Sequence, residues 1–319
     1  MKKVVVGIDI GGTNTAFGIV DIEGNIYGSD KVSTQAYPEV NDFIEELCGR
    51  IKNLLDSLPF LYELQGVGIG APNANYFKGT IEDAANLPWK GIVFFVDKFK
   101  KYFSGIPVYM TNDAKAAAMG EMIYGDAKGM KNFIVITLGT GLGSGFVVDG
   151  RLMLGHNSIA GELGHVTINP NGRICGCGRR GCLETYASAT GIKRTVFKLL
   201  ADNTDPSEFR DLSFNQLTAE MITGAALNGD SLAVEAYEYT GRVLGSALAN
   251  AVAVTDPEAI FLFGGLARAG KYILEPTKKY MEQSLMPNFR GKVKILLSAV
   301  DGMNAAILGA SALVWQHHK

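Results

Sequence analysis

In residues 4–25, VVVGIDIGGTNTAFGIVDIEGN, a β-branched run ends in the glycine-rich turn 11–14, and a second apolar run ends in the Asp/Gly turn 21–25. Apolar runs bounded by such turns predict strand, tight turn, strand, turn and strand. Residues 133–154, FIVITLGTGLGSGFVVDGRLML, repeat the pattern. Two copies of one hairpin unit in one chain predict two similar domains that face each other.

Both glycine-rich turns lie beside a strand end, where exposed backbone N–H groups can bind phosphate oxygens. Neither turn is a Walker loop, because Gly-x-x-x-x-Gly-Lys-Ser/Thr occurs nowhere in the chain. A single turn of this kind is more often only a hairpin turn. Two of them, the first preceded by the carboxylate of Asp9, favour a site for a polyphosphate with Mg²⁺.

Residues 161–184, GELGHVTINPNGRICGCGRRGCLE, contain a set of candidate metal ligands: His165, Cys175, Cys177 and Cys182. Three thiolates and one imidazole form a closed, structural Zn²⁺ site. Ordinary buried thiols or disulfides are the alternative, which the compact spacing and the lack of a secretory signal make the weaker interpretation. A metal that fixes this loop would also fix the flanking carboxylates of Glu162 and Glu184.

The composition is that of an ordinary globular protein of 319 residues, with 47% hydrophobic residues, 19% charged residues and a formal net charge of -2. The chain has no excess of basic residues that would indicate a nucleic-acid partner. It also has no apolar run long enough to span a membrane. Asp9 interrupts the N-terminal apolar run, which therefore predicts a strand and not a signal peptide. We expect a cytoplasmic protein with reduced thiols.

Apolar residues recur at helical spacing from Asn41 to Leu58, with Asn41 as the predicted N-cap. Cys48 lies on the apolar face of this helix and is expected to be core packing. Asn112 and Asp113 stand between a predicted strand and an alanine-rich helix. The pair alone is best explained as a helix N-cap, although ligands also bind at the carboxyl ends of strands in α/β folds.

Together these segments resemble the ROK family of repressors, open reading frames and sugar kinases, within the actin-like ATPase and hexokinase superfamily. Residues 175–184, with residues 162–165 upstream, are the most specific part of the resemblance. Four further segments match the phosphate, catalytic, second phosphate and adenosine segments of the family in the right order: residues 9–13, 112–113, 139–141 and 264–265.

The resemblance implies two ribonuclease H-like α/β domains closing on a cleft, one of residues 1–113 with 305–319 and one of residues 114–304. It also implies transfer of the ATP γ-phosphoryl group to a hexose, and hence ATP, Mg²⁺ and a structural Zn²⁺. By resemblance Asp113 is the general base and Asp9 orients Mg²⁺. The implied sugar-binding residues are Asn86, Asn112, Asp113, Glu162, His165 and Glu184. The implied nucleotide-binding residues are Asp9, Gly11, Gly12, Thr13, Thr140, Gly141, Gly264 and Gly265. A homodimer is what the family implies.

Glucose is the leading substrate by resemblance, and N-acetylmannosamine or N-acetylglucosamine is the alternative. Asn73 stands where many relatives have glycine, which leaves the fit around the sugar open. A sugar-sensing repressor is a different class; such proteins carry a helix-turn-helix domain before the first strand, and a strand that begins at Val4 leaves no room for one. A non-catalytic sugar-binding protein would bind sugar without producing ADP. The sugar, its anomer and any allosteric effector stay open.

Overall fold

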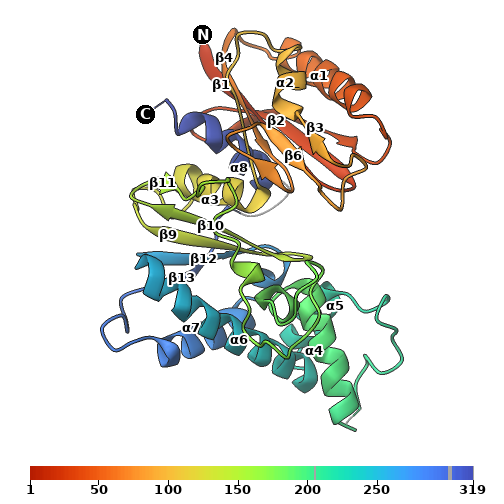
Figure 1. Cartoon of the computed structure of the whole chain (residues 1–319), viewed down its shortest axis with the longest axis vertical. Helices are drawn as coiled ribbons and strands as arrows, with labels where there is room; N and C mark the ends of the chain where they lie inside the picture. The colour runs from red at the N-terminus through yellow and green to blue at the C-terminus, as the bar shows by residue number, and fades with distance from the viewer. Residues whose placement is uncertain (205, 301–303, 319) are drawn as a thin grey trace. The chain divides into compact units, whose positions relative to one another are not determined.

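The computed structural model describes residues 1–204, 206–300 and 304–318 (Figure 1). It divides into two compact units, the first formed by Met1–Met130, Leu152–Ala160 and Ala299–Lys319, and the second by Lys131–Arg151 and Gly161–Ser298. The resemblance implies a different division, after residues 113 and 304, and that division stays a prediction.

The first unit is built on a five-stranded sheet of order β3-β2-β1-β4-β8. Strands β1, β2 and β3 form an antiparallel meander, whereas β4 and β8 run parallel to β1. Its elements are β1 (Lys2–Ile10), β2 (Asn14–Val20), β3 (Ile26–Ser33), α1 (Val40–Asp56), β4 (Tyr62–Gly70), β5 (Ala74–Asn75), β6 (Thr80–Glu82), β7 (Ile92–Val93), α2 (Phe95–Lys100), β8 (Val108–Thr111), α3 (Asp113–Tyr124) and α8 (Ala305–Trp315).

The second unit repeats this plan, with a five-stranded sheet of order β11-β10-β9-β12-β13. Strands β9 and β10 are antiparallel, and β12 and β13 are parallel to β9. Its elements are β9 (Phe133–Leu138), β10 (Leu142–Val148), β11 (Arg151–Leu152), η1 (Leu163–His165), η2 (Leu183–Thr185), α4 (Ala189–Asp202), α5 (Ala219–Leu227), α6 (Ser231–Thr255), β12 (Ala259–Phe263), η3 (Gly265–Ala269), α7 (Lys271–Ser284) and β13 (Lys294–Leu297). The predicted repeat and the α/β class are therefore confirmed.

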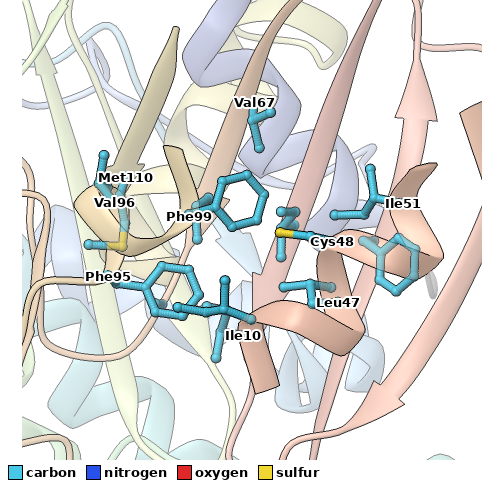
Figure 2. Close-up of a cluster of buried hydrophobic side chains, with 14 of the residues drawn as sticks. Ile10, Leu47, Cys48, Ile51, Val67, Phe95, Val96, Phe99 and Met110 are labelled. Atoms are coloured by element: carbon cyan, nitrogen blue, oxygen red, sulfur yellow. The ribbon is translucent and has the colours of Figure 1, made fainter. Parts of the chain in front are cut away.

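Helices α1 and α2 pack against the sheet of the first unit through buried apolar side chains (Figure 2). The labelled members of this core are Ile10, Leu47, Cys48, Ile51, Val67, Phe95, Val96, Phe99 and Met110. Cys48 is fully buried, and burial raises the pKa of its thiol to about 12, so its predicted packing role is confirmed. The predicted N-cap was wrong: α1 begins at Val40 after Glu39, and the Asn41 side chain instead accepts a hydrogen bond from Lys98.

Helix α8 packs closely on β1 and β4, next to α3. Two strand glycines permit this approach, because a Cβ atom would lie 2.2 Å from the Ile307 carbonyl oxygen at Gly7 and 1.9 Å from the Ala310 carbonyl oxygen at Gly68. Any side chain there would displace the helix backbone. Helix α8, near the C-terminus, is therefore part of the first unit and packs beside α3.

Helices α6 and α7 lie side by side in the second unit (Figure 1). Two α6 glycines permit this close approach, since an added Cβ would lie 2.7 Å from Pro276 Cγ at Gly241 and 2.4 Å from the Thr277 carbonyl oxygen at Gly245. Within the described ranges, the structure contains no helix with the length and apolar character needed to cross a membrane.

Candidate functional site

The first glycine turn, residues 11–14, joins β1 to β2. The Gly11 N–H donates to the Asn14 carbonyl across 3.1 Å and closes the turn. Gly12 faces Asn86, whose carbonyl oxygen would lie 2.9 Å from a Cβ at this position, so a larger residue would push the two loops apart. Thr13 is exposed, and its carbonyl accepts a hydrogen bond of 2.9 Å from the Thr34 N–H.

Asn86 lies in an exposed part of the segment that we call the Asn86 loop, residues 84–90. Lys90 fixes the shape of this loop, because its ammonium donates to three carbonyls of the loop itself. The acceptors are Ala84 at 3.4 Å, Ala85 at 3.2 Å and Leu87 at 2.8 Å. The loop also rests on the core through Trp89, which is buried and donates from its indole N–H to the Tyr37 carbonyl across 3.1 Å.

Asn112 and Asp113 stand at the junction of β8 and α3. Asn112 is the N-cap, and its side chain and the Asp113 carboxylate both accept from the Ala114 N–H, at 2.9 and 2.8 Å. Part of the Asp113 surface is exposed to solvent. Desolvation by the surrounding protein raises its pKa, while the N–H groups of the first helical turn and the charge of Lys115 act in the opposite direction.

Asp9 lies near the end of β1, close to Asp113. Gly70 lies next to both acids, because a Cβ built on it would lie 3.6 Å from Asp9 Oδ1 and 3.7 Å from Asp113 Cα. Burial raises the pKa of Asp9 to about 7, and repulsion from the Asp113 carboxylate adds to the shift. The first unit therefore gathers the predicted residues Asp9, Gly11, Gly12, Thr13, Asn86, Asn112 and Asp113.

Asn73 adopts the left-handed conformation with φ 51°, which explains why asparagine can replace glycine there. Its side-chain amide donates to the Glu82 carbonyl at 3.1 Å and to the Asp83 carbonyl at 3.3 Å. The amide thus ties the segment after β4 to the segment that leads into the Asn86 loop.

The second glycine turn, residues 139–141, joins β9 to β10. The Gly139 N–H donates to the Gly141 carbonyl at 3.0 Å, and Thr140, which is exposed, accepts on its carbonyl from the Thr190 hydroxyl at 3.1 Å. Gly264 follows β12, with φ 101°, and a Cβ there would lie 2.8 Å from the Leu138 carbonyl oxygen. Gly264 and Gly265 therefore lie against the end of β9, where the turn begins.

Glu162 is exposed immediately before η1. Its position follows from β10, because the Leu163 N–H donates to the Ser144 hydroxyl at 3.1 Å. Gly164 packs directly on the same strand, and a Cβ there would lie 2.2 Å from the Leu142 carbonyl oxygen. Glu162 and His165 thus lie at the two ends of one short helical turn, and this turn is fixed on β10.

Four side chains predicted as metal ligands come together: His165, Cys175, Cys177 and Cys182, whose ligand atoms all lie within 4.8 Å of one another. Cys177 Sγ lies 3.6 Å from Cys182 Sγ, and Cys175 Sγ lies 3.7 Å from His165 Nδ1. Zinc with Zn–S bonds of about 2.3 Å holds tetrahedral sulfurs about 3.8 Å apart. The donor set therefore fits a closed zinc site.

Backbone hydrogen bonds shape residues 161–184, which we call the zinc loop. Bridges pair Thr167 with Cys182 and Ile174 with Arg180. Gly181, with φ 76°, sits so close to the chain that a Cβ would lie 1.6 Å from the Asn169 carbonyl oxygen. The backbone N–H of Arg179 lowers the pKa of the Cys177 thiol to about 6, whereas burial raises the pKa of the Cys175 thiol to about 12.

Glu184 connects the zinc loop to the second glycine turn. Its Oε2 accepts from the Leu142 N–H at 3.0 Å, and the Cys175 thiol lies 3.6 Å from its Oε1. A Cβ at Gly141 would lie 2.3 Å from Oε2, so glycine is required for this approach. The second unit therefore gathers the predicted residues Thr140, Gly141, Glu162, His165, Cys175, Cys177, Cys182, Glu184, Gly264 and Gly265.

Sequence reasoning missed several residues that shape the site. The side chains of Lys90 and Gln35 donate hydrogen bonds to backbone carbonyls. No sequence motif marks a lysine or glutamine with this role. Ser144 lies inside a glycine-rich strand, and no motif marks it as a residue that fixes a neighbouring loop. The close packing of Gly12 on Asn86 could not be found either, because it joins loops that are far apart in the chain.

Both units carry the same strand order, and in each a glycine turn follows the first strand. This repeated architecture is the two-domain fold of the actin-like ATPase superfamily, as the resemblance implied. Residues 5–317 match the family model described as the ROK family, and the chain belongs to that family.

The chain is similar to both kinds of ROK protein. A glucokinase of Streptomyces coelicolor is 35% identical over 319 residues, covering 97% of each chain. The crystal structure of a ROK family glucokinase from Streptomyces griseus in complex with glucose and AMPPNP is 32% identical, with a TM-score of 0.81, and covers 98% of this chain and 99% of that one. A xylose repressor of Bacillus spizizenii is 30% identical, and the match covers 98% of this chain and 77% of the repressor.

Proposed function

We propose that this ROK chain is an ATP-dependent hexose kinase, with glucose as the leading substrate and Asp113 as the general base. The observation that carries the proposal is that two acids, Asp9 and Asp113, lie close together next to Gly70. A sensor needs only to recognise its sugar, whereas phosphoryl transfer needs both a base and a group for Mg²⁺. The similarity to glucokinases along the whole chain supports the same conclusion.

Asp113 would act on the hydroxyl that is phosphorylated. Phosphoryl transfer passes through a loose transition state, so catalysis depends on positioning and on neutralising charge. A carboxylate that orients the hydroxyl and takes its proton late is sufficient. The hydrogen bond from the Ala114 N–H fixes the carboxylate, and the raised pKa of Asp113 makes it a better proton acceptor.

The other residues would bind the substrates. Amides and carboxylates match adjacent sugar hydroxyls, which fits roles for Asn86, Asn112, Glu162 and Glu184. The N–H groups of both glycine turns would bind phosphate oxygens, with Gly264 and Gly265 near the adenosine. Mg²⁺ would neutralise phosphate charge, and Asp9, beside the first glycine turn, would hold it through water.

We further propose that the Cys₃His cluster holds a structural Zn²⁺. With four protein ligands the metal would keep no open position for water. His165 would use Nδ1 for the metal, since this atom faces Cys175, and would keep Nε2 for the sugar. The metal would thus fix the sugar-binding groups without taking part in the chemistry.

Two other functions compete with this proposal. An N-acetylhexosamine kinase would use the same base, and Asn73 gives it no special support, because its amide is engaged with backbone carbonyls. A sugar sensor without kinase activity is favoured by the similarity to the xylose repressor. The sensor would bind sugar and leave ATP unchanged.

The test is ADP release from Mg·ATP by the purified chain with glucose, mannose, fructose, N-acetylglucosamine and N-acetylmannosamine. Asp113→Asn is the control, since it keeps the size of the side chain and removes the base. We expect turnover on one sugar and a loss of ~10²-fold or more in kcat for the variant, with sugar binding largely kept.

Each result has a distinct meaning. Near-normal turnover by Asp113→Asn would require another base. Calorimetric sugar binding by the wild-type chain, without ADP release on any of the sugars, would replace the kinase with the sensor.

A further inference from the structure

Gln35 lies just beyond the end of β3, and its side-chain amide joins two loops that are far apart in the sequence. The Nε2 group donates to the Gly12 carbonyl of the first glycine turn and, at 3.3 Å, to the Asn86 carbonyl. An amide nitrogen carries two hydrogens, which matches these two acceptors. No sequence motif or family segment assigns a role to this residue.

The two acceptors belong to loops that touch. A Cβ built on Gly12 would lie 2.9 Å from the Asn86 carbonyl oxygen and 3.3 Å from Asn86 Nδ2. Two carbonyls directed at one point repel each other unless a donor stands between them. Gln35 supplies that donor, and the contact between the loops therefore depends on it.

The backbone that carries Gln35 is itself fixed. The neighbouring Thr34 donates its N–H to the Thr13 carbonyl at 2.9 Å, and its hydroxyl lies 2.9 Å from that of Thr15. Both threonines are fully buried, whereas Gln35 is exposed. The backbone next to Gln35 is thus anchored to the first glycine turn, although the Gln35 side chain is exposed.

We propose that Gln35 is a positioning residue that fixes Asn86 relative to the first glycine turn. This inference rests on the proposed function, in which Asn86 binds the sugar and the turn binds phosphates. Without the link each loop can move separately, and a displacement of about 1 Å can cost on the order of 10²-fold in rate. Gln35 would act through both loops and need not touch either substrate.

The decisive variant is Gln35→Glu, which keeps the size of the side chain but places a carboxylate oxygen against two carbonyls. We expect kcat/KM for the sugar to fall ~10- to 100-fold, with the KM for ATP also raised. Gln35→Lys, which restores a donor, should recover much of the loss. Gln283→Glu makes the same charge change on the exposed face of α7 and should behave as the wild-type chain.

Hydrogen–deuterium exchange supplies a readout that does not need turnover. In Gln35→Glu, but not in Gln283→Glu, we expect faster exchange in peptides covering the first glycine turn and the Asn86 loop. The reporter amides are Gly11, which donates to Asn14 at 3.1 Å, and Leu87, which donates to Ala84 at 3.2 Å.

The two hypotheses fail in different ways. If the wild-type chain phosphorylates a sugar and Gln35→Glu matches it in both kcat/KM and exchange, the role of Gln35 is wrong and the kinase stands. A variant that only melts at a lower temperature, with unchanged kinetics, would also overturn it. If the wild-type chain releases no ADP, the kinase fails, and the exchange data alone decide whether Gln35 links the loops.

Discussion

The backbone N–H of Leu142 donates to Oε2 of Glu184 across 3.0 Å. Leu142 is the first residue of β10, directly after the second glycine turn, and Glu184 lies in η2 at the end of the zinc loop. A carboxylate expected to bind sugar is therefore bonded to the turn expected to bind phosphate. A change at Gly141, the end of the turn that meets Glu184, should therefore reach the sugar through Glu184.

Gly141→Ala tests this connection. The new methyl group would lie 2.3 Å from Glu184 Oε2, so the carboxylate has to move. We expect the sugar KM to rise about tenfold, in steady-state assays, because a misplaced hydrogen-bonding group costs roughly 1–1.5 kcal/mol. Gly139→Ala is the matched control, since a methyl group there meets nothing within 4 Å and should have a much smaller effect.

A double-mutant cycle completes the test. Glu184→Ala should also raise the sugar KM, and Gly141→Ala should add little in its presence, because its target has gone. Full additivity of the two changes would mean that Gly141 acts directly on phosphate and not through Glu184.

Much of the fold could be predicted because its signals are local. The paired hairpins have β-branched runs and glycine turns in both halves of the chain, and these segments became β1–β2 and β9–β10. The Cys₃His set was equally accessible, since its ligands lie within 18 residues of sequence, His165 to Cys182, and glycines supply the turns.

The missed features are non-local. Gln35 and Lys90 bind carbonyls that any residue provides, so their partners leave no trace in the sequence. The N-cap of α1 failed for a related reason: Asn41 is a good cap by type, but its side chain bonds to Lys98 of α2. Tertiary contacts decided these cases, and local propensity could not.

Cys182 and Cys48 are equally buried, but only substitution of Cys182 should change the zinc content of the chain. We expect about one zinc per chain by elemental analysis, and its loss in Cys182→Ala, which removes one of four ligands. Cys48→Ala should lower the melting temperature, because it opens a cavity in the core shown in Figure 2, yet keep the zinc. Wild-type chain without zinc, or Cys182→Ala with a full complement, would contradict the proposed site.

Replacing Asn73 by glycine should cost less stability than replacing it by alanine. Both changes remove the bonds to the Glu82 and Asp83 carbonyls, but only alanine also suffers at φ 51°. We expect alanine to lower the free energy of unfolding by about 1 kcal/mol more than glycine does. Urea denaturation measures the difference, and equal losses would mean that the segment relaxes out of the left-handed conformation.

Asp9 should make the stability of the chain depend on pH. Its pKa is raised from 3.8 to about 7, first by burial and then by Asp113, so the folded chain binds this proton more tightly than the unfolded chain does. The contribution of Asp9 to the free energy of unfolding therefore falls as the pH rises from 3.8 to about 7, and is level above that. The full span corresponds to at most about 4 kcal/mol.

Asp9→Asn removes this dependence, because the amide does not titrate. Without nucleotide or Mg²⁺, the melting temperature of the variant relative to the wild-type chain should climb between pH 4 and pH 7 and then stay constant. Asp42→Asn, at an exposed carboxyl in the first turn of α1, corrects for the general effect of losing a charge. If the corrected difference is flat, the Asp9 carboxyl is solvated in the folded chain, and it would then be available to hold Mg²⁺ well below neutral pH.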